Sequence, residues 1–117
     1  MLRQLLGKFA EGRAADHLKA QGLNLVARNV RSRFGEIDLI MRDGEVLVFV
    51  EVRSRTRSDF GSAADSVTPA KQRRIVLAAR EYLARQRGLP PCRFDVVTLD
   101  GAQNNPVWIK NAFGDMG

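Results

Sequence analysis

The stretch GEIDLIMRDGEVLVFVEVRSR, residues 35–55, is the sequence feature that most constrains the fold. Two apolar runs flank the dipeptide Asp43-Gly44, which favours a two-residue turn because both residue types tolerate a positive φ angle. The stretch therefore predicts a β-hairpin. With Asp43 and Gly44 at the centre of the turn, the predicted pairs are Arg42 with Glu45, Ile40 with Leu47, Asp38 with Phe49, and Glu36 with Glu51.

Side chains alternate between the two faces of a strand, so the hairpin is predicted to have one apolar face and one polar face. The apolar face would carry Ile37, Leu39, Val46, Val48, Val50 and Val52. The polar face would carry Glu36, Asp38, Phe49, Glu51 and Arg53. Carboxylates at these positions take hydrophobic surface away from a small domain, which indicates a functional reason for them.

Two further segments have helical patterns. Residues 8–21 precede Gly22, a residue typical of helix C-termini, and Thr68-Pro69 predicts an N-cap and first turn for a helix that Gly88 ends. The second helix is predicted to bury Ile75, Ala78, Ala79 and Tyr82. One face of the first helix would carry Glu11, Ala14, Ala15 and Leu18. Glu11 is thus the odd residue on an otherwise apolar stripe.

Strands are also predicted at residues 23–30 and 94–99, with a polar loop at residues 56–67. Apolar residues of the C-terminal tail would dock on the body of the protein: Val107, Trp108, Ile109 and Phe113. The order is helix, three strands, helix and strand, which predicts an α/β fold with a short mixed sheet flanked by helices. A length of 117 residues favours one domain spanning residues 1–117.

The composition limits the partners and the compartment. A net charge of +6 and a sequence pI near 10.4 favour polyanions such as nucleic acid, although some domains are basic for solubility alone. The longest apolar run, residues 46–50, is far too short to span a membrane, and the N-terminus lacks the apolar core of a signal peptide. Cys92 is the only cysteine, which excludes an internal disulfide and a multi-cysteine zinc site. A cytoplasmic location without a membrane partner is expected.

The acidic residues of the hairpin predict a divalent-metal site. Diagonal residues such as Asp38 and Glu51 have Cβ atoms roughly 7–8 Å apart, so both carboxylates can lean toward one Mg²⁺ ion. Glu11 would complete the metal shell if the first helix packs over this edge. Taken singly, Glu51 and Arg53 could form a solvated salt bridge, and Asp38 and Glu11 could be surface residues. Their joint placement favours the metal site.

Such a site suits phosphodiester hydrolysis. A divalent cation polarises the phosphoryl oxygen and lowers the pKa of a bound water. Arg53, two residues beyond Glu51 on the same face, could stabilise charge on the phosphate.

The segments GEIDLI, VFVEVRSR and RFDVV, together with the basic helix before RFDVV, resemble the YraN family of small bacterial endonuclease-like proteins. This family belongs to the PD-(D/E)XK nuclease superfamily, with a fold like that of archaeal Holliday-junction resolvases. The resemblance runs from GRAADHL to NAF, nearly the whole chain. It implies a single restriction-endonuclease-like domain with an αβββαβ core, in agreement with the order predicted from the residues.

The resemblance also implies residue roles. Asp38 matches the metal-binding aspartate, Glu51 matches the acidic residue of the (D/E)XK element, Glu11 matches a first-helix glutamate, and the carbonyl of Val52 would be a further ligand. Arg53 stands where the lysine belongs, and arginine stays protonated in proteins. Lys71 or Gln72 is therefore an alternative source of the lysine's function.

The first hypothesis is a Mg²⁺- or Mn²⁺-dependent nuclease acting on DNA, branched or damaged, with Asp38, Glu51 and Arg53 as catalytic residues. Phosphate contacts would come from Arg31, Arg33, Arg55, Arg57, Lys71 and Arg74. A non-catalytic nucleic-acid-binding module with a degenerate site is the alternative that Arg53 favours, and a protein-interaction domain would use the tail around Trp108 and Phe113. A homodimer is expected only if the substrate is a junction, which needs two cuts.

Overall fold

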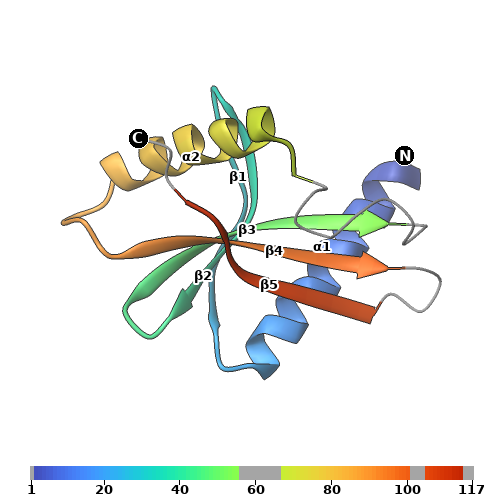
Figure 1. The fold of residues 1–117 in the computed structure, drawn as a ribbon. Coiled ribbons are helices and arrows are strands. Elements are labelled where there is room, and N and C mark those ends of the chain that lie inside the picture. The colour runs from blue at the N-terminus through green and yellow to red at the C-terminus, as the bar shows by residue number, and fades with distance from the viewer. Residues whose placement is uncertain (1, 56–66, 101–104, 115–117) are drawn as a thin grey trace.

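The computed structural model describes residues 2–55, 67–100 and 105–114 (Figure 1). Its elements form one five-stranded sheet in the order β1-β2-β3-β4-β5, in which β3 and β4 are parallel and the other neighbours antiparallel. The predicted α/β fold with a mixed sheet is confirmed. The elements are α1 (Leu2–Ala20), β1 (Asn24–Ser32), β2 (Gly35–Asp43), β3 (Val46–Arg55), α2 (Pro69–Ala84), β4 (Cys92–Asp100) and β5 (Asn105–Phe113).

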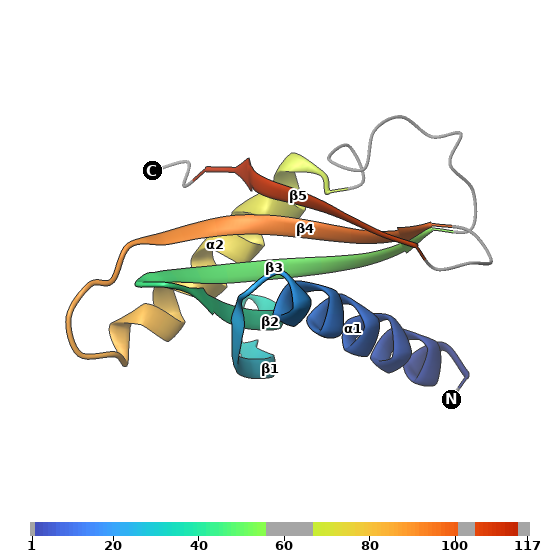
Figure 2. The ribbon, with the colours of Figure 1, turned by 90° about the horizontal axis from the view of Figure 1, so that it is seen from below.

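The two helices cover opposite faces of the sheet (Figure 2). On α1, three residues of the predicted stripe are fully buried, namely Ala14, Ala15 and Leu18. On α2, Ile75, Ala78 and Ala79 are buried, and Tyr82 packs against the same cluster. Both predicted helix faces are therefore confirmed. α2 covers one face because it makes the crossover connection that parallel strands β3 and β4 require, and α1 covers the other.

The hairpin of β2 and β3 has a different register from the predicted one. Ile40 pairs with Phe49, and Asp43 pairs with Val46, so the turn is centred on Gly44 and Glu45. The predicted register, which paired Ile40 with Leu47, is wrong by two residues. Because two residues is a whole side-chain period, the shift leaves the assignment of residues to faces intact.

The alternation of faces breaks in one place. Ile37 was predicted to share a face with Leu39, but Ile37 packs in the α2 cluster, whereas Leu39 packs in the α1 cluster. On the N-terminal side of Leu39, β2 still pairs with β1, and Ile37 lies opposite Val30. The matching break in β1 lies at Asn29, which has a left-handed φ of 51°. The prediction for Ile37 is wrong because both strands are irregular at this level.

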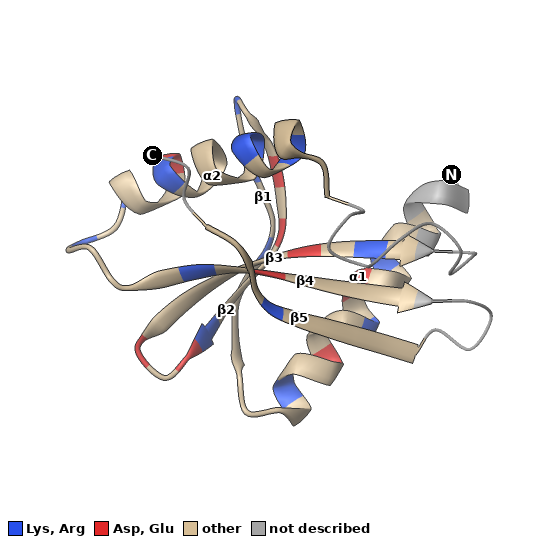
Figure 3. Cartoon of the chain, viewed as in Figure 1, with Lys and Arg blue, Asp and Glu red and all other residues tan. Residues whose placement is uncertain are grey.

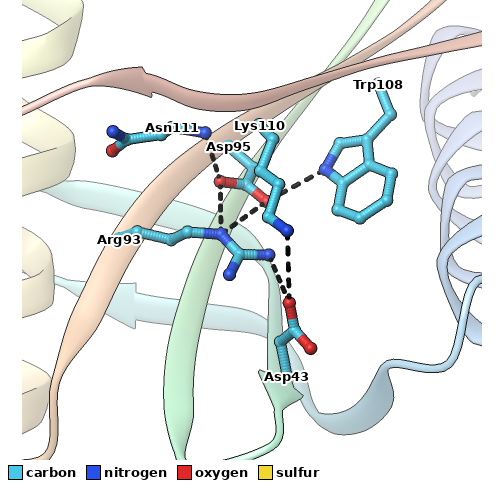
Figure 4. A network of polar contacts seen from close by, with 6 residues as sticks. All are labelled: Asp43, Arg93, Asp95, Trp108, Lys110 and Asn111. Carbon is cyan, nitrogen blue, oxygen red and sulfur yellow. Dashed lines mark hydrogen bonds and ion pairs between the residues drawn. The ribbon is translucent and has the colours of Figure 1, made fainter.

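The C-terminal tail forms a strand that the sequence did not reveal. β5 pairs with β4 and is tied to it by Asp95, which is fully buried (Figure 4). The Asp95 carboxylate accepts hydrogen bonds from Arg93 Nε at 3.1 Å, Trp108 Nε1 at 2.9 Å and the backbone N–H of Asn111 at 2.9 Å. Trp108 and Phe113 thus pack, partly buried, against the core of their own domain.

Several element ends differ from those predicted. α1 begins at Leu2 rather than at residue 8. α2 has the predicted N-cap, since Thr68 Oγ1 accepts from the N–H of Lys71 at 3.2 Å, but it ends at Ala84 rather than near Gly88. Most of the predicted polar loop, residues 56–66, lies outside the described residues. None of the described helices is both long and apolar enough to cross a membrane.

Candidate metal centre

The candidate site forms where β2 and β3 separate. Their paired residues run from Asp43 and Val46 to Leu39 and Val50. Asp38 directly precedes Leu39 in β2. Its carboxylate takes the place of a backbone acceptor, because its Oδ2 accepts the N–H of Val52 at 2.9 Å. A carboxylate is therefore fixed between the two strands.

A cleft of about 660 Å³ opens at this point, and both helices contribute to it. Acidic positions of β2 and β3 lie close to basic positions of β3 and α2 (Figure 3). The charged residues that line the cleft are Glu11 of α1, Glu36 and Asp38 of β2, Glu51 and Arg53 of β3, and Lys71 and Arg74 of α2. The structure thus brings together, in one cleft, all the predicted catalytic residues and metal ligands, including Val52.

Glu51 is the most deeply buried of these carboxylates, with a side chain only 5% exposed. Its Oε2 lies 2.9 Å from Lys71 Nζ and 3.7 Å from Arg53 Nη1. A buried carboxylate needs such a partner, because an unpaired charge away from water is strongly unfavourable. Lys71 of α2 therefore brings an ammonium group to the same Glu51 oxygen that Arg53 contacts.

Asp38 has a strongly perturbed acidity. The pKa of its carboxyl is raised from 3.8 to about 8, mainly by burial and next by the neighbouring charge of Glu51, against the opposing hydrogen bond from Val52. The charge of Glu11 and a side-chain hydrogen bond with Glu51 act in the same upward direction on this pKa. Without a cation, the cleft thus holds a proton in place of a full set of negative charges.

Three of the carboxylates can share one ion. Ligand oxygens of Glu11, Glu36 and Asp38 lie within 4.8 Å of one another. Carboxylate oxygens are the ligands that Mg²⁺ and similar hard cations prefer. The donor set therefore fits a divalent cation. Glu51 lies outside this group of three but contacts it through Asp38.

The predicted phosphate-binding residues are less concentrated. Lys71 and Arg74 line the cleft, whereas exposed Arg31 lines an adjoining cavity of about 510 Å³ and lies 3.5 Å from Glu36 through its Nε. Arg33 stacks its guanidinium over the ring of Phe34 at 4.9 Å. For Arg55 only the backbone position in β3 is described, and Arg57 lies outside the described residues.

Two residues near the cleft were not expected from the sequence, and Gln72, a candidate beside Lys71, makes a contact elsewhere. Gln72 donates to the carbonyl of Val67 at 3.0 Å, at the start of α2. Glu36 was placed on the polar face without a role in the site; its spacing of two from Asp38 is the signal for it. Asn29 donates to both Glu11 and Glu36. The only signal for this residue in the sequence was its position in a predicted strand, where asparagine is rare.

A mixed sheet with one helix on each face, opening onto an acidic cleft between two diverging strands, defines an α/β domain consistent with a nuclease-like fold. The sequence model of the Uncharacterised protein family UPF0102 matches residues 10–99. The chain belongs to this family, in agreement with its resemblance to YraN proteins.

Curated relatives agree with this membership. A UPF0102 protein of Dechloromonas aromatica is 60% identical over 109 residues, covering 92% of this chain and 87% of that protein. One of Cupriavidus taiwanensis is 58% identical over 113 residues, covering 95% and 84%. One of Nitrosospira multiformis is 55% identical over 114 residues, covering 97% and 96%. The similarity therefore extends over nearly the full length of each chain.

Proposed function

We propose that this protein is a divalent-cation-dependent nuclease that hydrolyses phosphodiester bonds in DNA. The observation that carries the proposal is the convergence of Glu11, Asp38 and Glu51, from three different elements, in one cleft that also holds basic side chains. A structural salt-bridge network would need no protonated carboxyl group, whereas the pKa of Asp38 is raised to about 8 by its burial and by Glu51. Clefts with such perturbed groups are typical of functional sites.

Mg²⁺ or Mn²⁺ would be held by Glu11, Asp38 and Glu51, with the carbonyl of Val52 as a further ligand. The cation would supply Lewis-acid stabilisation of a phosphodiester oxygen and a position where water ionises near neutral pH. Asp38 is held for this role by the N–H of Val52. When Asp38 engages a cation, its proton must leave, so cation binding is expected to release a proton.

The cationic residues of the cleft would act on the phosphate. Lys71 Nζ lies 2.9 Å from Glu51, and Arg53 contacts the same oxygen at 3.7 Å. A cation bound to Glu51 would weaken both pairs and leave Lys71 and Arg53 available for phosphate oxygens. The lysine of the superfamily motif would thus be replaced in function by Lys71, with Arg53 as a second positive charge.

The basic residues around the cleft support a nucleic-acid substrate. Arg31 and Arg33 lie near the turn between β1 and β2, and Arg74 lies on α2, so positive charge flanks the acidic centre. Such residues position a nucleic-acid backbone without reading its sequence. Branched or damaged DNA is the proposed substrate, and a homodimer is proposed only for the case of a four-way junction.

The test is cleavage of labelled linear, nicked and four-way-junction DNA, with matched RNA, in Mg²⁺, in Mn²⁺ and in EDTA. Wild type is compared with Asp38→Asn and with Asp16→Asn, which removes an exposed carboxylate from the same protein. Cutting that requires a divalent cation and Asp38, but not Asp16, is the expected result. Binding of DNA without cutting in any condition would instead support a non-catalytic nucleic-acid-binding module.

A further inference from the structure

Asn29 has an unusual conformation for a strand residue. It lies inside β1 with a φ of 51°, and among the described residues other than glycine only Asn111 also has a positive φ. Asparagine tolerates the left-handed region better than most residues. Its neighbours in β1 pair with Leu39 and Ile37 of β2, so Asn29 lies level with Asp38.

The conformation aims the Asn29 amide at two carboxylates. Asn29 Nδ2 donates to Glu11 Oε1 at 2.9 Å and to Glu36 Oε1 at 3.0 Å. A side-chain amide nitrogen has two N–H groups, and these contacts use both of them. One residue of β1 therefore joins a carboxylate of α1 to a carboxylate of β2.

We propose that Asn29 is a positioning residue that orients Glu11 and Glu36, and that Glu36 is thereby a further ligand of the cation. This inference rests on the proposed function, because it assigns residues to the same metal centre. Glu11, Glu36 and Asp38 already have oxygens within 4.8 Å of one another, and two of these three carboxylates are the acceptors of Asn29.

The chemistry of the amide suits this role. A lysine or arginine between Glu11 and Glu36 would neutralise them and compete with a metal ion. An amide donates two hydrogen bonds without carrying net charge, so it fixes the carboxylates and leaves their charge for the cation. The contact of Glu36 with Arg31 competes weakly, since that pair is 3.5 Å apart and the Arg31 side chain is 88% exposed.

The test compares two asparagine-to-glycine variants. Asn29→Gly removes the amide while glycine keeps the left-handed backbone. Asn111→Gly is the matched control, because Asn111 has a φ of 56° in β5 and its backbone N–H to Asp95 is retained. Calorimetric titration with Mn²⁺ should show roughly 10- to 100-fold weaker binding for Asn29→Gly and unchanged binding for Asn111→Gly. Melting temperatures in EDTA report any loss of folding separately.

Glu36→Gln tests the ligand without altering the backbone of β1. It should weaken Mn²⁺ binding, and the double variant with Asn29→Gly should lose less than the sum of the two single losses. An Asn29→Gly variant that binds Mn²⁺ with wild-type affinity would overturn this inference and leave the proposed nuclease intact. If Asn29→Gly does not fold, wild-type Mn²⁺ affinity in Glu36→Gln would do the same. A wild-type protein that binds no Mn²⁺ would overturn both.

Discussion

Replacing Asp38 with asparagine is expected to stabilise the metal-free protein at neutral pH. The folded protein keeps a proton on Asp38, because burial and the nearby charge of Glu51 raise the pKa of this carboxyl to about 8. Asparagine can still accept from the N–H of Val52 and can donate toward Glu51. It therefore imitates the protonated acid without having to take up a proton.

The size of the effect follows from the pKa difference. Below the ordinary pKa of 3.8, Asp38 is protonated in the folded and the unfolded chain. Between 3.8 and about 8, only the folded chain keeps the proton, so the free energy of unfolding falls as the pH rises, by about 1.4 kcal/mol per pH unit. From pH 5 to pH 7 this one group lowers the free energy of unfolding by about 3 kcal/mol, a large share of the roughly 5–15 kcal/mol of a typical domain.

Urea unfolding in EDTA at pH 5 and pH 7 measures the effect. The loss of stability between the two pH values should be about 3 kcal/mol larger for wild type than for Asp38→Asn. Taking this difference removes the contribution of every titrating group that the substitution leaves unchanged. Asp16→Asn, which also deletes one negative charge but from an exposed position, should behave as wild type. An equal pH dependence in wild type and Asp38→Asn would refute the reasoning.

Four further variants separate the contributions of the site from those of the fold. Glu11→Gln should weaken Mn²⁺ binding by roughly tenfold in a calorimetric titration, and unchanged affinity would make Glu11 structural. Lys71→Met should slow DNA cleavage by roughly 10²–10³-fold while Arg53→Lys preserves it, and the reverse order would assign the catalytic cation to Arg53. Asp95→Asn should lower the free energy of unfolding by about 3 kcal/mol, since it leaves Arg93 with a poorer partner, and should leave Mn²⁺ affinity unchanged.

The acidic face of the hairpin could be predicted because it depends only on the two-residue period of a strand. An error of two residues in register still placed Asp38 and Glu51 together. The stripe of α1 was equally predictable, since Ala14, Ala15 and Leu18 follow the helical period and carry Glu11 with them to the cleft. Local periodicity therefore sufficed for the fold class and for the core of the candidate site.

What periodicity missed depends on irregular backbone or on distant packing. The positive φ of Asn29 and the break in alternation at Ile37 have no signal in the hydrophobic pattern. The 2.9 Å contact of Lys71 with Glu51 depends on where α2 crosses the sheet, so the sequence could offer Lys71 only as one of two candidates. β5 was missed because Pro106 and Asn111 interrupt a short apolar segment.

Titration of Mn²⁺ into metal-free wild type and Asp38→Asn at pH 7 tests most directly whether the acidic cleft is a divalent-cation site. Wild type should bind the cation and release about one proton as Asp38 ionises, which repeating the titration in buffers of different ionisation enthalpy would measure. Asp38→Asn should bind much more weakly and release no such proton. Equal binding by the two proteins, or no binding by wild type at millimolar Mn²⁺, would contradict the assignment of the cleft as a metal centre.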